Sequence, residues 1–394
     1  MEAVVADDIQ LPLDQPHLLQ APPALRALQA DGPIHRVRTP IGDPAWLVTS
    51  YEEIRRLFGD DDLGRAHPDP EHADRTGNSA LFGGPLGDFE TEAEDHARMR
   101  RLLQPHFSPK RMRELQPRVA ALTASLLDDL ARRDPPADLV DALALPLPVL
   151  VICELLGVPY ADRARFRGWT QDVADVRDRV RSERGLAALF DYGLYLVARK
   201  RADPDDDVIS ALCATHGVDD DEIARLAMAL LFAGHESTVV SIGFGAAALL
   251  ANDQWPVLLA NPDLILDAVE EILRIENTGG AGIPRYARAD TRIGDVTVRA
   301  GELVLLDIGA ANHDPTVFTE PDRFDPTLHG APHVAFGHGA RYCIGAPLAR
   351  IELHAVFSQL VPRFPAMALT GPLDHLQIHD NLVAGGLVEL AVTW

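Results

Sequence analysis

Cys343 lies in a glycine-rich stretch near the end of the sequence, Phe336-Gly337-His338-Gly339-Ala340-Arg341-Tyr342-Cys343-Ile344-Gly345. Glycines lacking a Cβ let the backbone turn tightly and approach a flat cofactor closely. Pro347 and apolar residues at helical spacing follow, so we expect a helix to begin just after the cysteine. The positive end of a helix favours a thiolate. The stretch therefore predicts a thiolate ligand for an iron centre, with Arg341 as a cation for a nearby anion.

A second unusual stretch, Ala233-Gly234-His235-Glu236-Ser237-Thr238, interrupts the most apolar helical region of the chain. Small residues at 233 and 234 would allow a ligand to approach the backbone, and the hydroxyl groups can bond back to helix carbonyls. We interpret the stretch as a place for water and dioxygen beside the metal. The alternative is a set of buried polar groups that are satisfied within the helix.

Two further pairs of polar residues have helical spacing. His96 and Arg100 are one turn apart, and two donors in that relation suit carboxylates. Glu271 and Arg274 are three residues apart, close enough to pair on one helix face. The second spacing occurs in many helices and carries little information alone.

Together these segments resemble the cytochrome P450 family. Its haem-binding pattern, Phe-Gly-x-Gly-x-His/Arg-x-Cys-x-Gly, matches here at every fixed position, including Phe336, Gly337 and Gly345. The resemblance implies that Cys343 binds the iron of haem b. It also implies that the haem propionates are bound by His96, Arg100, Arg285 and Arg341.

The same resemblance assigns roles to the other segments. In the family's oxygen-activation motif an acid and an alcohol deliver protons to dioxygen. Here Glu236 is the acid and Ser237 replaces the usual threonine, with Thr238 following and Ala233 and Gly234 preceding. The family's structural triad would be Glu271, Arg274 and Arg323.

The resemblance implies a soluble bacterial monooxygenase that inserts one oxygen atom from O2 by hydroxylation or epoxidation. Electrons would come from NAD(P)H through a reductase and ferredoxin, because no flavin domain is apparent. Gly279-Gly280-Ala281-Gly282 suggests a roomy pocket and a bulky polyketide or macrolide, with a terpenoid or a peptide as alternatives. Candidate substrate contacts are Leu81, Phe82, Leu230, Ala233, Gly282, Ile283 and Val383. A peroxide-driven enzyme and a non-catalytic haem-binding partner remain alternatives.

The elements that would position these residues are mostly helical. Apolar residues recur at helical spacing over 94–103, 119–130, 148–156, 186–199, 219–250 and 264–275. A turn leading into a strand is expected over 41–49, and strands are expected over 291–298, 303–306 and 387–394. We predict a mainly α protein with small β-sheets, a long central helix over the haem and a single domain over residues 1–394.

Composition limits the remaining possibilities. A net charge of −23 makes nucleic acid or an anionic membrane an unsuitable partner. The three cysteines have no paired spacing, and no signal peptide is apparent, which indicates a cytoplasmic protein. Residues 226–251 are apolar, but a buried core helix explains them more simply than a membrane span. The basic segment 98–113, with Arg98, Arg101 and Lys110, is either a solvated helix face or a docking site for an acidic ferredoxin.

Overall fold

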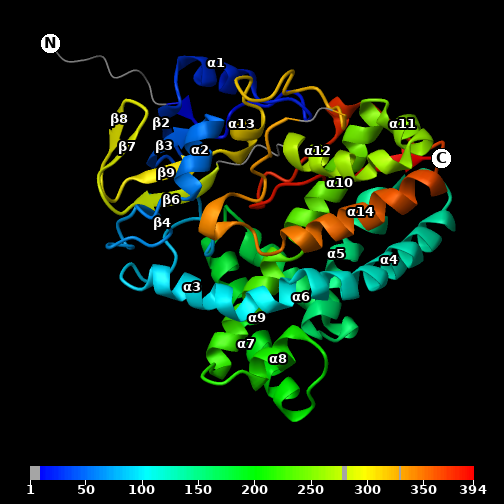
Figure 1. Cartoon of the computed structure of the whole chain (residues 1–394), viewed down its shortest axis with the longest axis horizontal. Helices are drawn as coiled ribbons and strands as arrows, with labels where there is room; N and C mark the ends of the chain where they lie inside the picture. The colour runs from blue at the N-terminus through cyan, green and yellow to red at the C-terminus, as the bar shows by residue number, and fades with distance from the viewer. Residues whose placement is uncertain (1–8, 277–281, 328–329) are drawn as a thin grey trace. The chain divides into compact units, whose positions relative to one another are not determined.

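The computed structural model describes residues 9–276, 282–327 and 330–394 (Figure 1). Contacts within the chain divide it into two compact units, each built from two stretches of sequence. Unit 1 comprises Met1–His96 and Leu273–Cys343, and unit 2 comprises Ala97–Ile272 and Ile344–Trp394. The single domain expected over residues 1–394 stays a prediction.

Unit 1 contains a mixed β-sheet. Within the described residues its strand order is β1-β2-β3-β9-β6-β4. The bounds are β1 Ile9–Gln10, β2 Ile34–Arg38, β3 Pro44–Val48, β4 Leu63–Gly64, β6 Ile283–Ala287 and β9 Leu303–Leu306. Strand β3 runs parallel to β9, and β6 runs antiparallel to it. A separate hairpin, β7 Thr291–Ile293 and β8 Val296–Val298, confirms the strands expected over 291–298.

The central strand β9 is buried on both faces, as its unbroken apolar sequence predicts. Leu303 and Leu305 belong to one apolar cluster, and Val304 and Leu306 belong to another. Because side chains alternate across a strand, these two clusters lie on opposite faces of the sheet. Both faces of the sheet are therefore covered at β9.

The helices of unit 1 are short. They are α1 Pro23–Asp31, α2 Tyr51–Phe58 and α13 Ile308–Asn312. Helix α2 begins after Ser50, whose side chain accepts a hydrogen bond from the N–H of Glu53. A serine at this position satisfies one of the N–H groups that lack a partner at a helix start. The apolar face of α2 packs into the cluster on one side of the sheet, with Ile54 and Leu57 almost fully buried.

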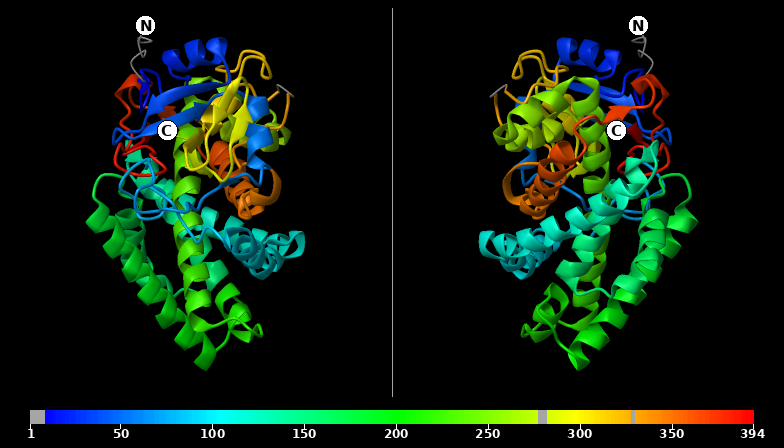
Figure 2. Two further views of the ribbon diagram at one scale, coloured as in Figure 1. Left: turned by 90° about the vertical axis from the view of Figure 1, so that its left-hand side faces the viewer. Right: turned by 90° about the vertical axis from the view of Figure 1, so that its right-hand side faces the viewer.

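Unit 2 holds most of the helices. In chain order they are α4 Pro109–Ala131, α5 Pro146–Leu156, α6 Arg163–Ala174, α7 Arg179–Ala202, α8 Val208–Ala214, α9 Asp220–Ala233, α10 Glu236–Ala251, α11 Gln254–Ala260 and α14 Ala346–Arg363. Helices α3 Glu92–Leu103 and α12 Ile265–Ile275 each begin in one unit and end in the other. The long helix α7 packs along α6 and α9 (Figures 1 and 2). The mainly α class with small sheets is confirmed.

Helix α10 is deeply buried in unit 2, with every residue from Val240 to Leu249 inside the protein. A Cβ at Gly245 would overlap the side chains of Ile272 and Phe357, so glycine permits close helix packing there. Helices α9 and α10 together are long and apolar enough to cross a membrane by composition, but 61% of the apolar window is buried inside the protein. That burial is typical of a core helix.

The helices expected over 119–130 and 186–199 are parts of the longer helices α4 and α7. Two further expectations also differ from the structure. The helix expected over 219–250 is divided into α9 and α10, with Gly234 and His235 between them. The strand expected over 387–394 is reduced to β11 Ala391–Thr393, which lies between β10 Ala368–Leu369 and β5 Ala137–Asp138. Both differences depend on contacts with distant segments, and local periodicity does not report these.

Candidate active site

The cysteine loop, residues 336–345, lies where the second sequence stretch of unit 1 ends, at Cys343. Cys343 follows a short 3₁₀ turn, Gly339–Arg341, and its side chain is exposed. The N–H of Cys343 donates to the carbonyl of Phe336 at 2.9 Å, so the loop closes on itself. Helix α14 begins three residues after the cysteine, with Gly345 as its N-cap and Pro347 in its first turn. The expected helix start is confirmed.

Two glycines shape this loop. Gly337 has φ of 69° and Gly339 has φ of 70°, a left-handed conformation that other residues rarely adopt. A Cβ at Gly339 would lie 3.1 Å from the Cα of Gly59, and a Cβ at Gly337 would contact the ring of Phe58. Glycine at both positions therefore lets the loop pack closely on the end of α2, which fixes the position of the cysteine.

Unit 1 also contains an arginine cluster, which we define as Arg65, Arg285, Arg288 and Arg341. Arg285 lies in β6 with 7% of its surface exposed. Burial, followed by the positive charges of Arg65 and Arg341, lowers the pKa of Arg285 to about 9. Burial likewise lowers the pKa of Arg65. The cluster is a partly desolvated group of like charges, and such a group favours the binding of an anion.

One carboxylate, that of Glu92, lies within this cluster. Its oxygens accept hydrogen bonds from Arg341 at 2.6 Å and from Arg288 at 3.3 Å. Sequence reasoning identified Arg285 and Arg341 but missed Arg65, Arg288 and Glu92. Glu92 and Arg341 are 249 residues apart, and no local pattern signals their contact.

His96 and Arg100 both lie in α3, four residues apart, and both side chains are half-buried. This spacing puts the two donors on one face of the helix. Their assignment to propionates stays a prediction.

The junction between α9 and α10 is held by His235. Its buried ring contacts the hydroxyl of Thr170 at 3.3 Å through Nε2 and the carbonyl of Leu231 at 3.1 Å through Nδ1. Burial lowers the pKa of His235 to about 4, so the ring is neutral at pH 7. A Cβ at Gly234 would overlap Ile152 and the carbonyl of Leu230. Close packing therefore favours glycine at position 234, and two polar contacts hold the ring of His235 at the break.

Glu236 is the first residue of α10 and is half-buried. Burial raises the pKa of its carboxyl to about 7, which lets the group accept and donate a proton at neutral pH. Ser237 is exposed, and its carbonyl accepts a hydrogen bond from Ser241 at 3.2 Å. Thr238 is buried, and Ala233, the last residue of α9, is exposed.

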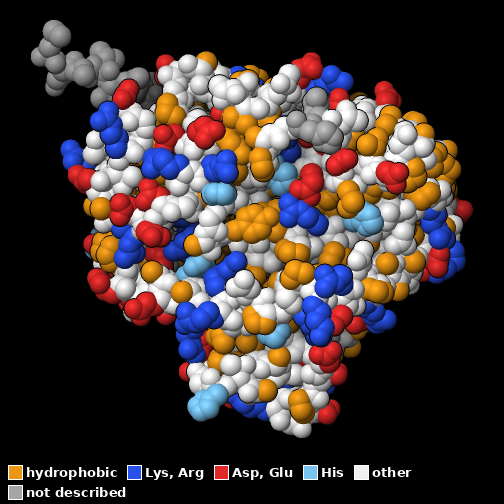
Figure 3. Space-filling model, in the orientation of Figure 1, with side chains coloured by type: hydrophobic (Ala, Val, Ile, Leu, Met, Phe, Trp, Pro, Cys, Tyr) orange, Lys and Arg blue, Asp and Glu red, His pale blue; other side chains and the backbone are white. Residues whose placement is uncertain are grey.

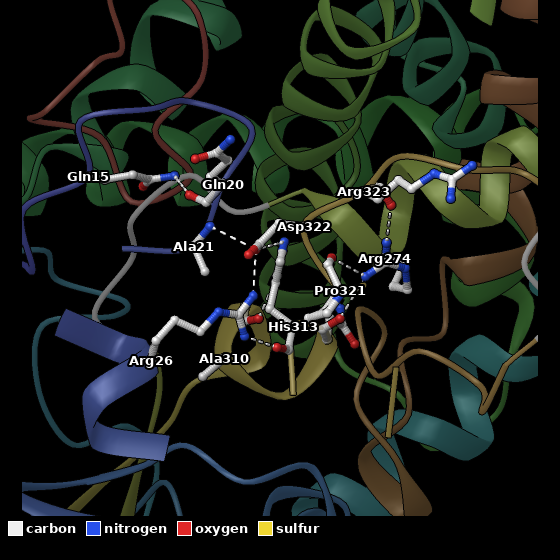
Figure 4. Close-up of polar contacts among 12 residues, drawn as sticks. Gln15, Gln20, Ala21, Arg26, Arg274, Ala310, His313, Pro321, Asp322 and Arg323 are labelled. Atoms are coloured by element: carbon white, nitrogen blue, oxygen red, sulfur yellow. Dashed lines mark hydrogen bonds and ion pairs between the residues drawn. The ribbon is translucent and has the colours of Figure 1, made fainter. Parts of the chain in front are cut away.

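Two of the predicted triad residues, Arg274 and Arg323, lie in a polar network of unit 1 (Figure 4). Arg274 is buried and donates to the carbonyls of Asn312 and Pro321, both at 2.9 Å, and to that of Arg323 at 3.2 Å. The guanidinium of Arg323 is exposed and forms an ion pair with Glu320 at 3.0 Å. Arg323 thus meets Arg274 through its backbone carbonyl.

Glu271, the remaining member of the predicted triad, is buried and lies three residues before Arg274 in α12. The triad assignment stays a prediction.

The predicted substrate contacts are distributed over both units. In unit 1, Leu81, Phe82 and Ile283 are half-buried, and Gly282 has φ of 82°. Gly279, Gly280 and Ala281 lie outside the described residues. In unit 2, Leu230 is buried in α9 and Val383 lies in the C-terminal segment. Their contact with substrate stays a prediction.

Val383 also joins two distant parts of unit 2. Its N–H donates to the carbonyl of Ala174 at 3.0 Å, and the N–H of Val176 donates to the carbonyl of Asn381 at 2.9 Å. These bonds tie the turn between α6 and α7 to the C-terminal segment.

The basic segment 98–113 is partly neutralised by acids of unit 2. Arg98 forms a two-point ion pair with Glu222, with contacts of 2.6 and 2.7 Å. Arg101 and Lys110 are exposed. Over the face drawn in Figure 3, Lys and Arg side chains are interspersed with Asp and Glu side chains. Exposed positive charges are thus present but do not form a uniform patch on that face.

Comparison with known proteins identifies the family. Residues 263–376 match the family model described as Cytochrome P450. Pentalenolactone synthase of Streptomyces exfoliatus is 44% identical over 397 residues, covering 98% of this chain and 99% of that protein. Mycinamicin IV hydroxylase/epoxidase of Micromonospora griseorubida is 39% identical, covering 93% of this chain and 94% of that protein. The substrate-free structure of cytochrome P450 PimD, a polyene macrolide antibiotic pimaricin epoxidase, has a TM-score of 0.89 and 42% identity, covering 99% of this chain and 100% of that one. The chain belongs to the cytochrome P450 family.

Proposed function

We propose that this chain is a haem-thiolate monooxygenase that inserts one oxygen atom from O2 into a bulky, hydrophobic secondary metabolite. The observation that carries this proposal is the exposed thiol of Cys343 in a loop shaped by two left-handed glycines. The relatives' names support hydroxylation or epoxidation as the reaction.

The residues of unit 1 fit haem b. Its two propionates are carboxylates, and the arginine cluster is a group of buried and half-buried cations bonded to the carboxylate of Glu92. Burial is the main cause of the lowered pKa of Arg285, and added carboxylates would offset the repulsion from Arg65 and Arg341 that lowers it further. Cys343 would hold the iron, and Arg285 and Arg341 would bind the propionates. The family resemblance adds His96 and Arg100 as further propionate donors.

Bound haem would supply the binding and reductive activation of O2. The chain's own contribution is the delivery of protons. Burial raises the pKa of Glu236 to about 7, so its carboxyl can both release and regain a proton near neutral pH. Ser237 carries the exposed hydroxyl that would pass the proton on. Serine lacks the methyl group that restricts a threonine rotamer, so we expect some reductant to be lost as peroxide.

The substrate class rests on the relatives. One relative is named for mycinamicin IV, and the pimaricin epoxidase is described as acting on a polyene macrolide antibiotic. A macrolide is therefore the first candidate, and a terpenoid or a peptide is an outcome that the same experiment would reveal. Leu81, Phe82, Leu230, Ala233, Gly282, Ile283 and Val383 are the proposed contacts.

Electrons would come from NAD(P)H through a reductase and an acidic ferredoxin in the cytoplasm. The exposed cations Arg101 and Lys110 suit an acidic partner. Arg98 contributes less to docking, because Glu222 already neutralises it.

An optical titration tests the proposal. The purified ferric protein is mixed with macrolides, terpenoids, cyclic peptides and fatty acids, and the Soret band is followed. A shift from low-spin to high-spin with one class would identify that class as the ligand. Cys343→Ser is the control, and it should lose the thiolate spectrum. A wild-type protein that binds haem without a thiolate spectrum would refute the proposal, and turnover with peroxide alone at a comparable rate would support the peroxide-driven alternative.

A further inference from the structure

We propose that Glu92 is a positioning residue, which holds Arg341 in the orientation needed to bind a haem propionate and limits the positive potential of the arginine cluster. The inference rests on the proposed haem site. It concerns a residue that belongs to none of the motifs recognised in the sequence.

The carboxylate of Glu92 is almost completely enclosed, with 8% of the side chain exposed. Oε1 accepts hydrogen bonds from Arg341 Nη2 at 2.6 Å and from the N–H of Arg65 at 2.8 Å. Oε2 accepts from the N–H of Ala66 at 3.1 Å and from Arg288 Nη1 at 3.3 Å. A single carboxylate therefore joins the cysteine loop, the segment after β4 and the residue after β6.

The backbone is shaped to admit this carboxylate. A Cβ at Gly64 would overlap Oε2 of Glu92, so glycine leaves the space that the oxygen fills. Gly64 is paired with Tyr286 in the sheet, and Tyr286 follows Arg285 directly. The position of Glu92 is thus fixed by the same pair of strands that carries one of the proposed propionate ligands.

An acid at the start of a helix has a simpler use, because it stabilises the positive end of the helix. An exposed side chain is sufficient for that role. Glu92 is instead buried and bonded to residues 26 to 249 positions away. Burial alone would raise its pKa, but the two backbone N–H groups together with Arg341 and Arg288 outweigh burial and lower it. Glu92 is therefore an anion throughout the neutral pH range.

This anion acts on the cluster in two ways. Its bond to Arg341 fixes the direction of that guanidinium, and its charge opposes the repulsion between Arg341, Arg65 and Arg285. Without the charge, the surroundings of the propionates become more positive, and a more positive site favours reduction of the haem. Without the fixed direction, a propionate loses a well-placed donor and the haem is released faster. The two effects are measured independently.

The experiment compares the haem-containing wild-type protein with Glu92→Gln and Glu92→Asp. Haem loss is followed by transfer to excess apomyoglobin, and the midpoint potential is measured by redox titration. We expect Glu92→Gln to lose haem about tenfold faster, the scale typical for residues that orient a metal-site ligand. Its midpoint potential should move to a more positive value. Glu92→Asp keeps the charge, so its potential should stay close to that of wild type even where haem loss is faster.

Glu302 provides a matched control in the same unit. Its carboxylate also binds an arginine, Arg36 at 3.3 Å, and a backbone N–H, that of Arg299 at 2.8 Å. It also accepts from the indole of Trp46 at 2.9 Å. Glu302→Gln should lower the unfolding temperature without changing haem loss or potential, because Glu302 does not contact the arginine cluster in the described part of the chain.

The outcomes separate the two proposals. If Glu92→Gln loses haem no faster than Glu302→Gln and its midpoint potential is unchanged, the role proposed for Glu92 is overturned. The proposed haem site is not affected by that result. A wild-type protein without a thiolate haem spectrum would overturn the proposed function itself. Gly64→Ala keeps Glu92 but displaces its carboxylate, and faster haem loss in this variant would support the positioning role independently.

Discussion

Replacing Glu236 by Gln is expected to change how the stability of the protein depends on pH. Burial raises the pKa of this carboxyl from 4.5 to about 7. Between these values the folded protein keeps a proton that the unfolded chain has lost. The contribution of Glu236 to stability is therefore greatest below pH 4.5 and is lost as the pH rises to about 7. Glutamine cannot ionise, so Glu236→Gln removes this loss.

The size of the effect follows from the shift. One pKa unit corresponds to about 1.4 kcal/mol, so the shift from 4.5 to about 7 corresponds to about 3 kcal/mol. Glu236 is only half-buried, and solvent screening reduces this to ~2 kcal/mol. Glu236→Gln should also lower the rate of product formation about a hundredfold or more, because it removes a proton donor and acceptor.

The assay is the unfolding free energy of wild type, Glu236→Gln and Ser237→Ala between pH 5 and 8. The advantage of Glu236→Gln over wild type should grow by roughly 1–2 kcal/mol over this range. Ser237→Ala is the control, since it removes no titratable group and its difference from wild type should not vary with pH. A difference between Glu236→Gln and wild type that is the same at every pH would refute the raised pKa.

Four further outcomes are expected. Ser237→Ala should increase the share of NAD(P)H electrons recovered as peroxide, whereas Ser237→Thr should reduce it; unchanged coupling in both would contradict proton delivery by this hydroxyl. Arg101→Glu should weaken ferredoxin binding in a salt-dependent manner, and an unchanged affinity at low salt would exclude this face. Burial raises the pKa of Glu352 well above its usual value, and its Oε2 has no partner among the described residues. Glu352→Gln should therefore raise the unfolding temperature above that of wild type at pH 7, and this advantage should shrink as the pH falls towards 4.5; a large loss at pH 7 would contradict a neutral carboxyl. Gly245→Val should destabilise unit 2 by about 1–3 kcal/mol in denaturant unfolding because it overfills the contact with Ile272 and Phe357, and a neutral effect would contradict that packing.

The cysteine loop could be predicted because its determinants are local. Gly337, Gly339 and Cys343 lie within seven residues of one another, and the left-handed turns follow from the lack of a Cβ at the two glycines. The helix after the loop was also indicated locally, by Pro347 and the apolar spacing that follows.

The contacts that hold the break between α9 and α10 and the role proposed for Glu92 could not be placed in this way. The sequence indicates an interruption at residues 233–238 of the helix expected over 219–250, but it does not indicate that His235 there contacts Thr170, 65 residues earlier. An acid at the start of a helix is common, so the sequence does not single out Glu92. Its partners lie beside it because the sheet pairs Gly64 with Tyr286. Patterns in one sequence report neighbours along the chain, whereas these two features are set by neighbours in space.

The bonds between the C-terminal segment and the turn joining α6 to α7 have a consequence for altering this enzyme. Because Val383 and Asn381 pair with the backbone of Ala174 and Val176, a change in the length of either segment shifts the register of both. Exchanging the turn alone between relatives should cost activity that is restored when residues 380–383 are exchanged with it. Mutant libraries that aim at new substrates should therefore vary the two segments together.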